Sequence, residues 1–101
     1  MDEDIFELIE KMRQEFGIYT SKISKAYSEI LAFIAGCLME YRVKNELTQE
    51  EVANKVFMPV KLISDIEAGI HDITLSELVF IVGMLGGEIK LELKLGSEGE
   101  E

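Results

Sequence analysis

The sequence is poor in the residues from which disulfide frameworks, metal sites and hydrolytic active sites are built. Its 101 residues include one cysteine, Cys37, and one histidine, His71. A single cysteine cannot form a disulfide within the chain, which favours a reducing compartment. One histidine and one cysteine supply neither a Ser-His-Asp set nor a zinc cluster. We therefore expect a protein that is not an enzyme and that uses no cofactor and no metal ion.

Proline and long apolar runs are also scarce. Pro59 is the single proline, and the eight glycines leave little room for long loops. No apolar stretch approaches the roughly 20 residues that a membrane-spanning helix needs. The acidic start, MDEDIFELIEK, is unlike the basic start of a secretion signal. At this length we expect one cytoplasmic domain that does not associate with a membrane.

Basic residues are outnumbered two to one. The chain has 10 lysines and arginines against 20 aspartates and glutamates, for a net charge of −10. Acidity is concentrated at the two ends, yet residues 46–70 also carry five acidic and two basic side chains. A protein that binds duplex DNA is expected to present a basic face. Any affinity for DNA should therefore be modest and should fall as salt is added.

Two short helices joined by a tight turn are predicted between residues 47 and 69. Thr48 and Glu51 form a Thr-x-x-Glu capping box at the start of the first helix. Pro59 suits the first turn of the second helix, and Gly69 suits the left-handed position that ends it. Apolar residues recur at helical spacing in both helices, at Val52, Ala53, Val56, Leu62, Ile63 and Ile66. A rigid helix pair of this size is a common means of presenting one helix to the DNA major groove.

Further helices are predicted on both sides of this pair. Downstream, Thr74 and Glu77 form a second capping box, from which an apolar face runs to Gly86-Gly87. Upstream, a long helix runs from about residue 20 to about residue 45 and carries small residues for close packing. Cys37 is one of these small residues, and we expect it to be buried.

The first 19 residues predict an additional amphipathic helix. Its apolar side chains follow helical spacing, acidic residues cover much of the rest, and Gly17 is the expected stop. This helix is either a strut that packs on its own domain or an arm that lies on a partner.

The order of these elements resembles the Cro/lambda-repressor (XRE) helix-turn-helix family over about residues 30 to 86. The family pattern Leu-Thr-Gln-x-x-Leu-Ala is matched by residues 47–53 with Val52 in place of the leucine, the pattern Ile-Ser-x-Ile-Glu-x-Gly by residues 63–69, and Ser/Thr-Leu by Thr74-Leu75. The resemblance implies an all-α, five-helix lambda-repressor-like helix-turn-helix domain at residues 20–87. It also implies a transcriptional regulator, a repressor that binds double-stranded DNA at an operator with twofold-symmetric half-sites.

The resemblance, together with candidate phosphate contacts such as Lys55, assigns DNA binding to the first short helix and to the second, the recognition helix. The residues concerned are Thr48, Gln49, Lys55, Val60, Lys61, Leu62 and Asp65. In the family, the glutamine at the position of Gln49 contacts a phosphate and supports the recognition helix. Lys61 could reach a guanine or a phosphate, and Asp65 could accept from a cytosine amine but would otherwise repel the DNA backbone. Val60 and Leu62 could contact only thymine methyl groups, which gives weak discrimination between bases.

Other positions near the motif have two interpretations. Lys55, Arg42 and Lys44 are candidate phosphate contacts, and solvated surface charges are the alternative. His71 lies in the loop before Thr74, where the family approaches the DNA backbone; the alternative is a solvent-exposed loop histidine. Phe57 replaces the glycine usual in the turn, which leaves the geometry of the turn open.

In residues 88–95, polar and apolar side chains alternate at every position, which is the pattern of a half-buried strand. A solitary strand leaves its own backbone groups unpaired, so we expect it to pair with a second copy. The result would be an antiparallel ribbon across a twofold axis, with dimerisation through Ile89, Leu91, Leu93 and Leu95. A homodimer would place two recognition helices ~34 Å apart, about one DNA turn. Residues 96–101 are predicted to be an acidic, disordered tail.

The combination resembles the HigA-like antitoxins of bacterial toxin–antitoxin pairs, small XRE-type proteins that repress their own operon as dimers. An acidic first helix suits a basic RNA-cleaving toxin through charge complementarity. Two alternatives stay open. One is a phage or host XRE regulator without a toxin, and the other is a protein-interaction module that kept the fold and lost DNA binding.

Overall fold

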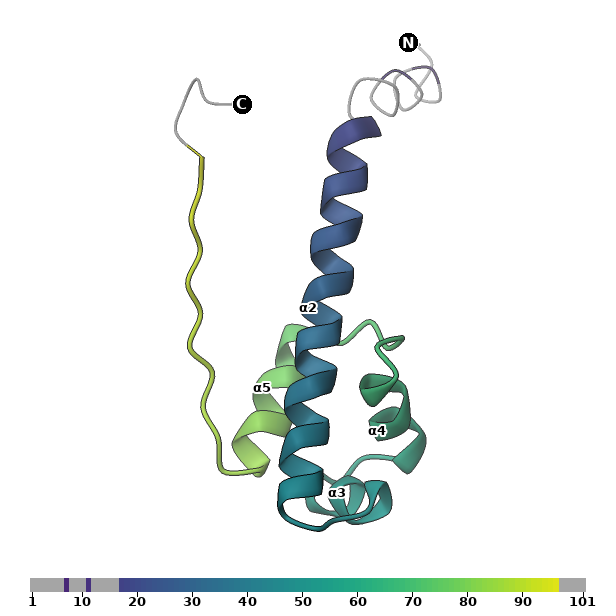
Figure 1. The fold of residues 1–101 in the computed structure, drawn as a ribbon, viewed down its shortest axis with the longest axis vertical. Coiled ribbons are helices and arrows are strands. Elements are labelled where there is room, and N and C mark those ends of the chain that lie inside the picture. The colour runs from purple at the N-terminus through teal and green to yellow at the C-terminus, as the bar shows by residue number, and fades with distance from the viewer. Residues whose placement is uncertain (1–6, 8–10, 12–16, 97–101) are drawn as a thin grey trace.

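The computed structural model describes residues 7, 11 and 17–96 of the chain. In residues 17–96, four helices follow one another: α2 (Gly17–Lys44), α3 (Gln49–Lys55), α4 (Val60–Glu67) and α5 (Leu75–Met84). Figure 1 shows α2 as the long axis of the molecule, with α3 at its C-terminal end and with α4 and α5 on opposite sides of it. The helix expected within residues 1–19 and the tail expected at 96–101 lie almost wholly outside the described residues.

The core lies where the C-terminal half of α2 meets the three short helices. Its fully buried side chains are Val52, Val56 and Ile63, and Leu38 and Ile81 connect them to α2 and α5. Most of these are the apolar positions at helical spacing from which the short helices were predicted. Burial of one such side chain contributes about 1.5–3 kcal/mol. The core therefore fixes α3 against α4, the relationship on which a helix-turn-helix depends.

The two predicted capping boxes are confirmed. Thr48 Oγ1 accepts from the Glu51 N–H at 3.0 Å, and Glu51 Oε1 accepts from the Thr48 N–H at 2.8 Å. Thr74 and Glu77 repeat the arrangement at 3.0 and 2.9 Å. Each N-cap contributes about 1 kcal/mol to the stability of its helix. These boxes set the first residue of α3 and of α5.

Pro59 lies one position earlier than predicted. It is the N-cap of α4, with φ of −65° and ψ of 147°, and so stands just outside the helix. Its carbonyl accepts the N–H of Leu62 at 3.0 Å, which begins the first turn. The prediction that Pro59 belongs to that turn is wrong, because its extended ψ takes it out of helical geometry.

All four helices end with a residue in the left-handed conformation. These residues are Glu46, Phe57, Gly69 and Gly86, with φ of 56°, 57°, 74° and 79°. After each, the next N–H reaches back across the last turn, as Gly87 N–H does to the Val82 carbonyl at 2.9 Å. The stops predicted at Gly69 and Gly86 are confirmed. Phe57 adopts the conformation of the glycine that it replaces, at a cost of about 1–2 kcal/mol.

Two predictions about α2 are wrong. The helix already includes Gly17, whereas a start near residue 20 was predicted; one glycine costs a helix only about 1 kcal/mol. Cys37 is exposed instead of buried. Ala35 and Leu38 occupy the buried side of this helix, and Cys37 lies on a neighbouring face.

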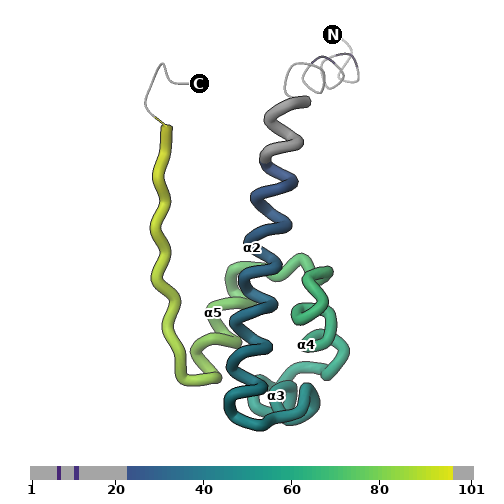
Figure 2. Tube along the Cα trace, viewed as in Figure 1, coloured from purple at the N-terminus to yellow at the C-terminus, as the bar shows by residue number. Residues whose placement is uncertain are grey.

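Residues 88–95 leave α5 and run back beside α2 as an extended segment (Figures 1 and 2). Within the described part of the chain this segment pairs with no strand, so the predicted strand is not observed and the described fold is all-α, with four helices. A strand needs a neighbour to bond with, and the described residues of one copy provide none. No helix among the described residues combines the length and the apolar character that crossing a membrane requires.

Candidate nucleic-acid interface

Helix α4 presents two chemically different faces. Ile63 and Ile66 are buried in the core, while Val60 is 45% exposed and Lys61 is also exposed on the outer side. Leu62 is half-buried and packs against the core. Of the residues assigned to base contacts, Val60, Lys61 and the half-buried Asp65 therefore form the outer edge of α4, and Leu62 lies toward the inside.

The charges on this outer edge neutralise each other. Lys61 Nζ lies 2.9 Å from Asp65 Oδ2, one helical turn further on, and the two side chains are 82% and 27% exposed. Such a surface pair contributes only about 0.3–0.5 kcal/mol, so solvent or a ligand can displace it easily. The structure thus places the predicted DNA-binding cation beside a carboxylate that reduces its attraction for phosphate.

Glu67, at the end of α4, connects three helices. Its carboxylate accepts from Arg42 of α2 at two points, at 2.8 Å to Oε2 and 3.1 Å to Oε1. Gln49, the first residue of α3, donates its Nε2–H to Glu67 Oε1 at 2.9 Å. The Glu67 side chain is only 5% exposed, and its hydrogen bonds raise the pKa of Arg42 above the ordinary value. Gln49 is thereby held against the recognition helix.

The sequence interpretation did not identify Glu67 as a site residue. A signal was present, since Glu67 is four residues after Ile63 and so borders the buried stripe of α4. A carboxylate at such a border requires a donor from another element. The sequence does not say which donor, because Arg42 is 25 residues away.

Arg42 is engaged within the protein and is not a free phosphate contact. Besides its two bonds to Glu67, its Nη1 donates to the Leu47 carbonyl at 3.2 Å. Arg42 therefore has a structural role and is not the solvated surface charge of the alternative interpretation. Lys44 and Lys55 are exposed at the C-terminal ends of α2 and α3. Thr48 lies next to Gln49, with its hydroxyl used in the capping box.

The loop between α4 and α5 is fastened at two points. His71 Nε2 lies 3.0 Å from Glu77 Oε1, so His71 is partly buried and not a freely solvated loop histidine. Tyr27 of α2 donates its hydroxyl to Asp72, and this bond raises the pKa of Tyr27. The Thr74 backbone N–H, and after it His71, lower the pKa of Glu77. The loop is thus tied to both α2 and α5.

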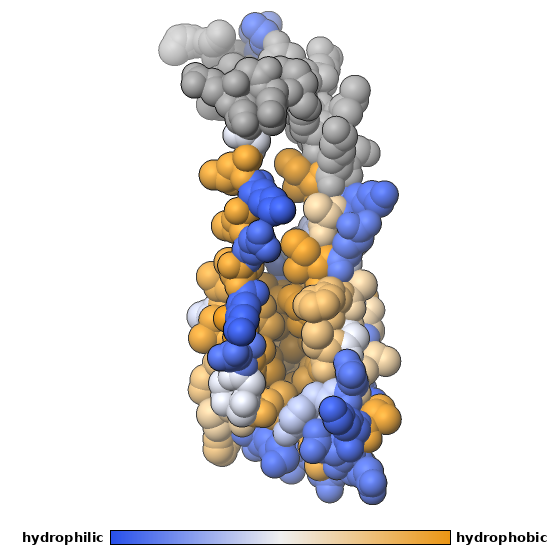
Figure 3. All heavy atoms as spheres, turned by 60° about the vertical axis from the view of Figure 1, so that its left-hand side comes forward, coloured by the Kyte–Doolittle hydropathy of each residue, from blue (hydrophilic) through white to orange (hydrophobic). Residues whose placement is uncertain are grey.

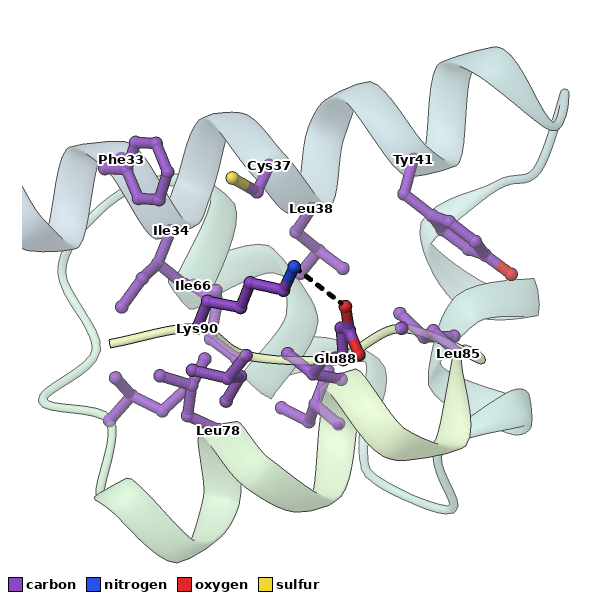
Figure 4. A pocket seen from close by; sticks show the side chains of 15 residues that line it. Phe33, Ile34, Cys37, Leu38, Tyr41, Ile66, Leu78, Leu85, Glu88 and Lys90 are labelled. Carbon is purple, nitrogen blue, oxygen red and sulfur yellow. Dashed lines mark ion pairs between the residues drawn. The ribbon is translucent and has the colours of Figure 1, made fainter. Parts of the chain in front are cut away.

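An apolar groove lies on the α5 side of α2, and Ile66 of α4 also contributes to its lining. Figure 3 shows apolar side chains gathered around a hollow on this face. The groove has a volume of about 410 Å³ and is bounded by α2, α5 and residues 87–90. Figure 4 shows Ile34, Leu38 and Tyr41 on its α2 side and the Glu88–Lys90 ion pair at its mouth, with a separation of 3.6 Å. Most of its lining residues are apolar, in contrast to the charged outer edge of α4.

Comparison with known families agrees with the helix-turn-helix arrangement of α3 and α4. A family model described as helix-turn-helix matches residues 38–91, slightly more than half of the chain. The match extends from the C-terminal part of α2 through α3, α4 and α5 into the extended segment. No match was found among curated proteins or among solved structures. The chain belongs to the XRE-type helix-turn-helix family of DNA-binding regulators.

Proposed function

We propose that the chain is a transcriptional repressor that binds operator DNA as a homodimer and serves as the antitoxin of a toxin–antitoxin pair. The orientation of α4 carries the DNA-binding part of this proposal. Ile63 and Ile66 hold the helix to the core while Val60 and Lys61 face outward. A helix held in this way can enter the major groove without any change in the core.

Gln49 supports the proposal from the adjacent helix. Its Nε2 donates one hydrogen to Glu67, and a side-chain amide has a second hydrogen to donate. A phosphate oxygen is the acceptor that such a group meets at the edge of the major groove. Gln49 would then join the DNA backbone to the recognition helix through Glu67.

Charge limits how strong this binding can be. The net charge of −10 repels phosphate, and Asp65 offsets Lys61 at the recognition edge. Each phosphate that a lysine or arginine neutralises releases counterions, so the affinity should be modest and should fall as salt is added. Specificity must come from fit to a particular operator more than from general attraction.

The test is a binding titration on the DNA upstream of the chain's own reading frame. Fluorescence anisotropy compares this duplex with a scrambled duplex of equal length and composition, at low and at physiological salt. Repression through α4 predicts a preference for the native duplex of at least about tenfold, equivalent to about 1.4 kcal/mol. Equally poor binding of both duplexes at low salt would rule it out.

The proposed homodimer follows from the exposed C-terminal segment. Leu91 and Leu93 are each 74% exposed, and the segment lies on the opposite side of α2 from α4 (Figure 1). Pairing through the segment therefore leaves the recognition helix open. Replacing Leu91 and Leu93 together with aspartate should give monomers by light scattering. Persistent dimers would locate the interface elsewhere.

The antitoxin role rests on charge and on the exposed half of α2. A chain with net charge −10 complements a basic RNA-cleaving partner, and all residues from 23 to 30 are exposed. A pull-down from the native host, read for both protein and nucleic acid, tests for such a partner. Removing residues 1–19, the stretch expected to form the partner-binding arm, should abolish toxin neutralisation and spare operator binding. A host with no small basic partner encoded beside this chain would favour a regulator without a toxin.

A protein-interaction module that has lost DNA binding is the second candidate, and one observation favours it. Phe57, in the turn before α4, is 78% exposed, and Val60 at the start of α4 is 45% exposed. An exposed aromatic near a neutralised lysine suits a protein surface better than phosphate. The titration described above separates the two functions, because the module predicts no preference for the native duplex.

A further inference from the structure

The C-terminal segment, residues 88–95, is held to the rest of the chain only at its beginning. Ile89 is 40% exposed and lines the groove, whereas exposure rises to 74% at Leu91 and 90% at Leu95. Among the described residues, the last backbone hydrogen bond before this segment is from Gly87 to Val82. Its backbone donors and acceptors are therefore available to another strand.

The charged residues of the segment alternate in sign. They are Glu88, Lys90, Glu92 and Lys94. Lys90 Nζ lies 3.6 Å from Glu88, and Lys94 Nζ lies 3.9 Å from Glu92, so each pair of neighbours shares one side of the segment. All four side chains are at least 76% exposed. Contacts of this kind within one strand contribute little in water, so the charges are free to face a second strand.

We propose that two copies pair through this segment as an antiparallel ribbon whose twofold axis passes through Leu91. The inference rests on the proposed homodimer and specifies its register. Residues at equal distances on either side of the axis then face each other. Glu88 meets the partner's Lys94, Lys90 meets the partner's Glu92, and symmetry repeats each pair. Opposite charges directly across an antiparallel pair are stabilising.

In the neighbouring registers that still place apolar side chains opposite apolar side chains, like charges face each other. With the axis at Lys90, that lysine faces its own copy and Glu88 faces the partner's Glu92. With the axis at Glu92, that glutamate faces its copy and Lys90 faces the partner's Lys94. Like charges directly opposite each other destabilise a sheet. Moving the axis by two residues from Leu91 again places opposite charges face to face, but only half of the charge pairs remain.

The same register places the apolar residues together. Ile89 faces the partner's Leu93, and Leu91 faces its own copy on the axis. Shifting the register by a single residue relative to the pleat would place apolar opposite charged side chains. A parallel ribbon in register would bring every glutamate against a glutamate. The order of the charges and the positions of the apolar residues thus both favour the same arrangement, the antiparallel ribbon with its axis at Leu91.

The test uses three charge variants of the full chain, with dimer dissociation measured by analytical ultracentrifugation. Variant one, Glu88→Lys with Glu92→Lys, and variant two, Lys90→Glu with Lys94→Glu, each place like charges in all four pairs. Each alone should dissociate with a Kd raised by about tenfold or more. A mixture of the two restores every opposite pair and should form a one-to-one heterodimer.

The matched control reverses all four charges, combining the substitutions of variants one and two. It keeps the net charge and the complementarity about Leu91, and should dimerise like the parent. Circular dichroism confirms that each variant is folded, as expected because the segment is outside the core. If variants one and two dimerise as tightly as the parent, the register is wrong while the homodimer stands. A monomeric parent would instead overturn the homodimer, whatever the variants do.

Discussion

Arg42 and Glu67 form a two-point ion pair that fastens the end of α4 to α2, with bonds of 2.8 and 3.1 Å. The Glu67 side chain is 5% exposed and also accepts from Gln49. One carboxylate therefore positions both the recognition helix and the polar residue beside it. The stability of the fold and the geometry of the proposed DNA-binding edge depend on the same group.

Glu67→Ala should lower the free energy of unfolding by about 1–3 kcal/mol, because it leaves the donors of Arg42 and Gln49 without their acceptor. Urea denaturation followed by circular dichroism measures this change. Glu50→Ala, at an exposed position in the first turn of α3, is the matched control and should change stability by less than about 0.5 kcal/mol. Equal effects of the two substitutions would show that the Glu67 cluster does not stabilise the fold.

Phe57→Gly should stabilise the protein by up to about 1 kcal/mol. Phe57 has φ of 57° and is 78% exposed, so glycine relieves backbone strain while little burial is lost; the greater freedom of glycine in the unfolded chain offsets part of the gain. Thermal and urea unfolding give the change in stability. Phe57→Ala removes the same ring but keeps a Cβ, and it should give no such gain. If alanine stabilises as much as glycine, the exposed ring and not the backbone is the source of strain.

Local chemistry explains which features the sequence predicts. The capping boxes at Thr48 and Thr74 and the stop at Gly69 involve residues within a few positions of one another, and all three are confirmed. Contacts between residues distant in sequence cannot be predicted in this way. The bond from Arg42 to Glu67 depends on how α2 packs on α4, and the exposure of Cys37 depends on which face of α2 that packing covers.

The C-terminal segment shows another limit of prediction. Alternation in residues 88–95 indicates an extended conformation, and the segment is extended (Figure 1). Whether it forms a strand depends on a neighbouring strand, which the described residues do not supply. The pairing stays a prediction, although the charge order within the segment is specific enough to choose between registers.

Substitutions at the outer edge of α4 should move DNA affinity in opposite directions. Lys61→Ala should weaken operator binding by about 1–3 kcal/mol if Lys61 contacts a base. Asp65→Asn should strengthen binding, because it removes the carboxylate 2.9 Å from Lys61 Nζ. Anisotropy titrations on the native upstream duplex measure both. Lys25→Ala, at an exposed position on α2, controls for the loss of one positive charge. If Lys61→Ala and Lys25→Ala are indistinguishable, Lys61 is not part of the site.

The capping box of α5 should make stability depend on pH in the acidic range. The Thr74 backbone N–H, and after it His71, lower the pKa of Glu77 below its ordinary value of 4.5. The folded chain thus favours the carboxylate, whose contribution is complete above the pKa of the unfolded chain. As the pH falls through the lower pKa of the folded chain, that contribution is lost.

Glu77→Gln isolates this effect, because glutamine still accepts the Thr74 N–H in a capping box but does not titrate near pH 4. The free energy of unfolding of the parent should exceed that of the variant at neutral pH, and the difference should shrink as the pH falls from about 5 to about 3. Urea denaturation across this range measures it, with Glu50→Gln at the start of α3 as the control for loss of a carboxylate in a first helical turn. A difference that stays constant over the whole range would mean that the folded chain holds Glu77 no more strongly as a carboxylate than the unfolded chain does.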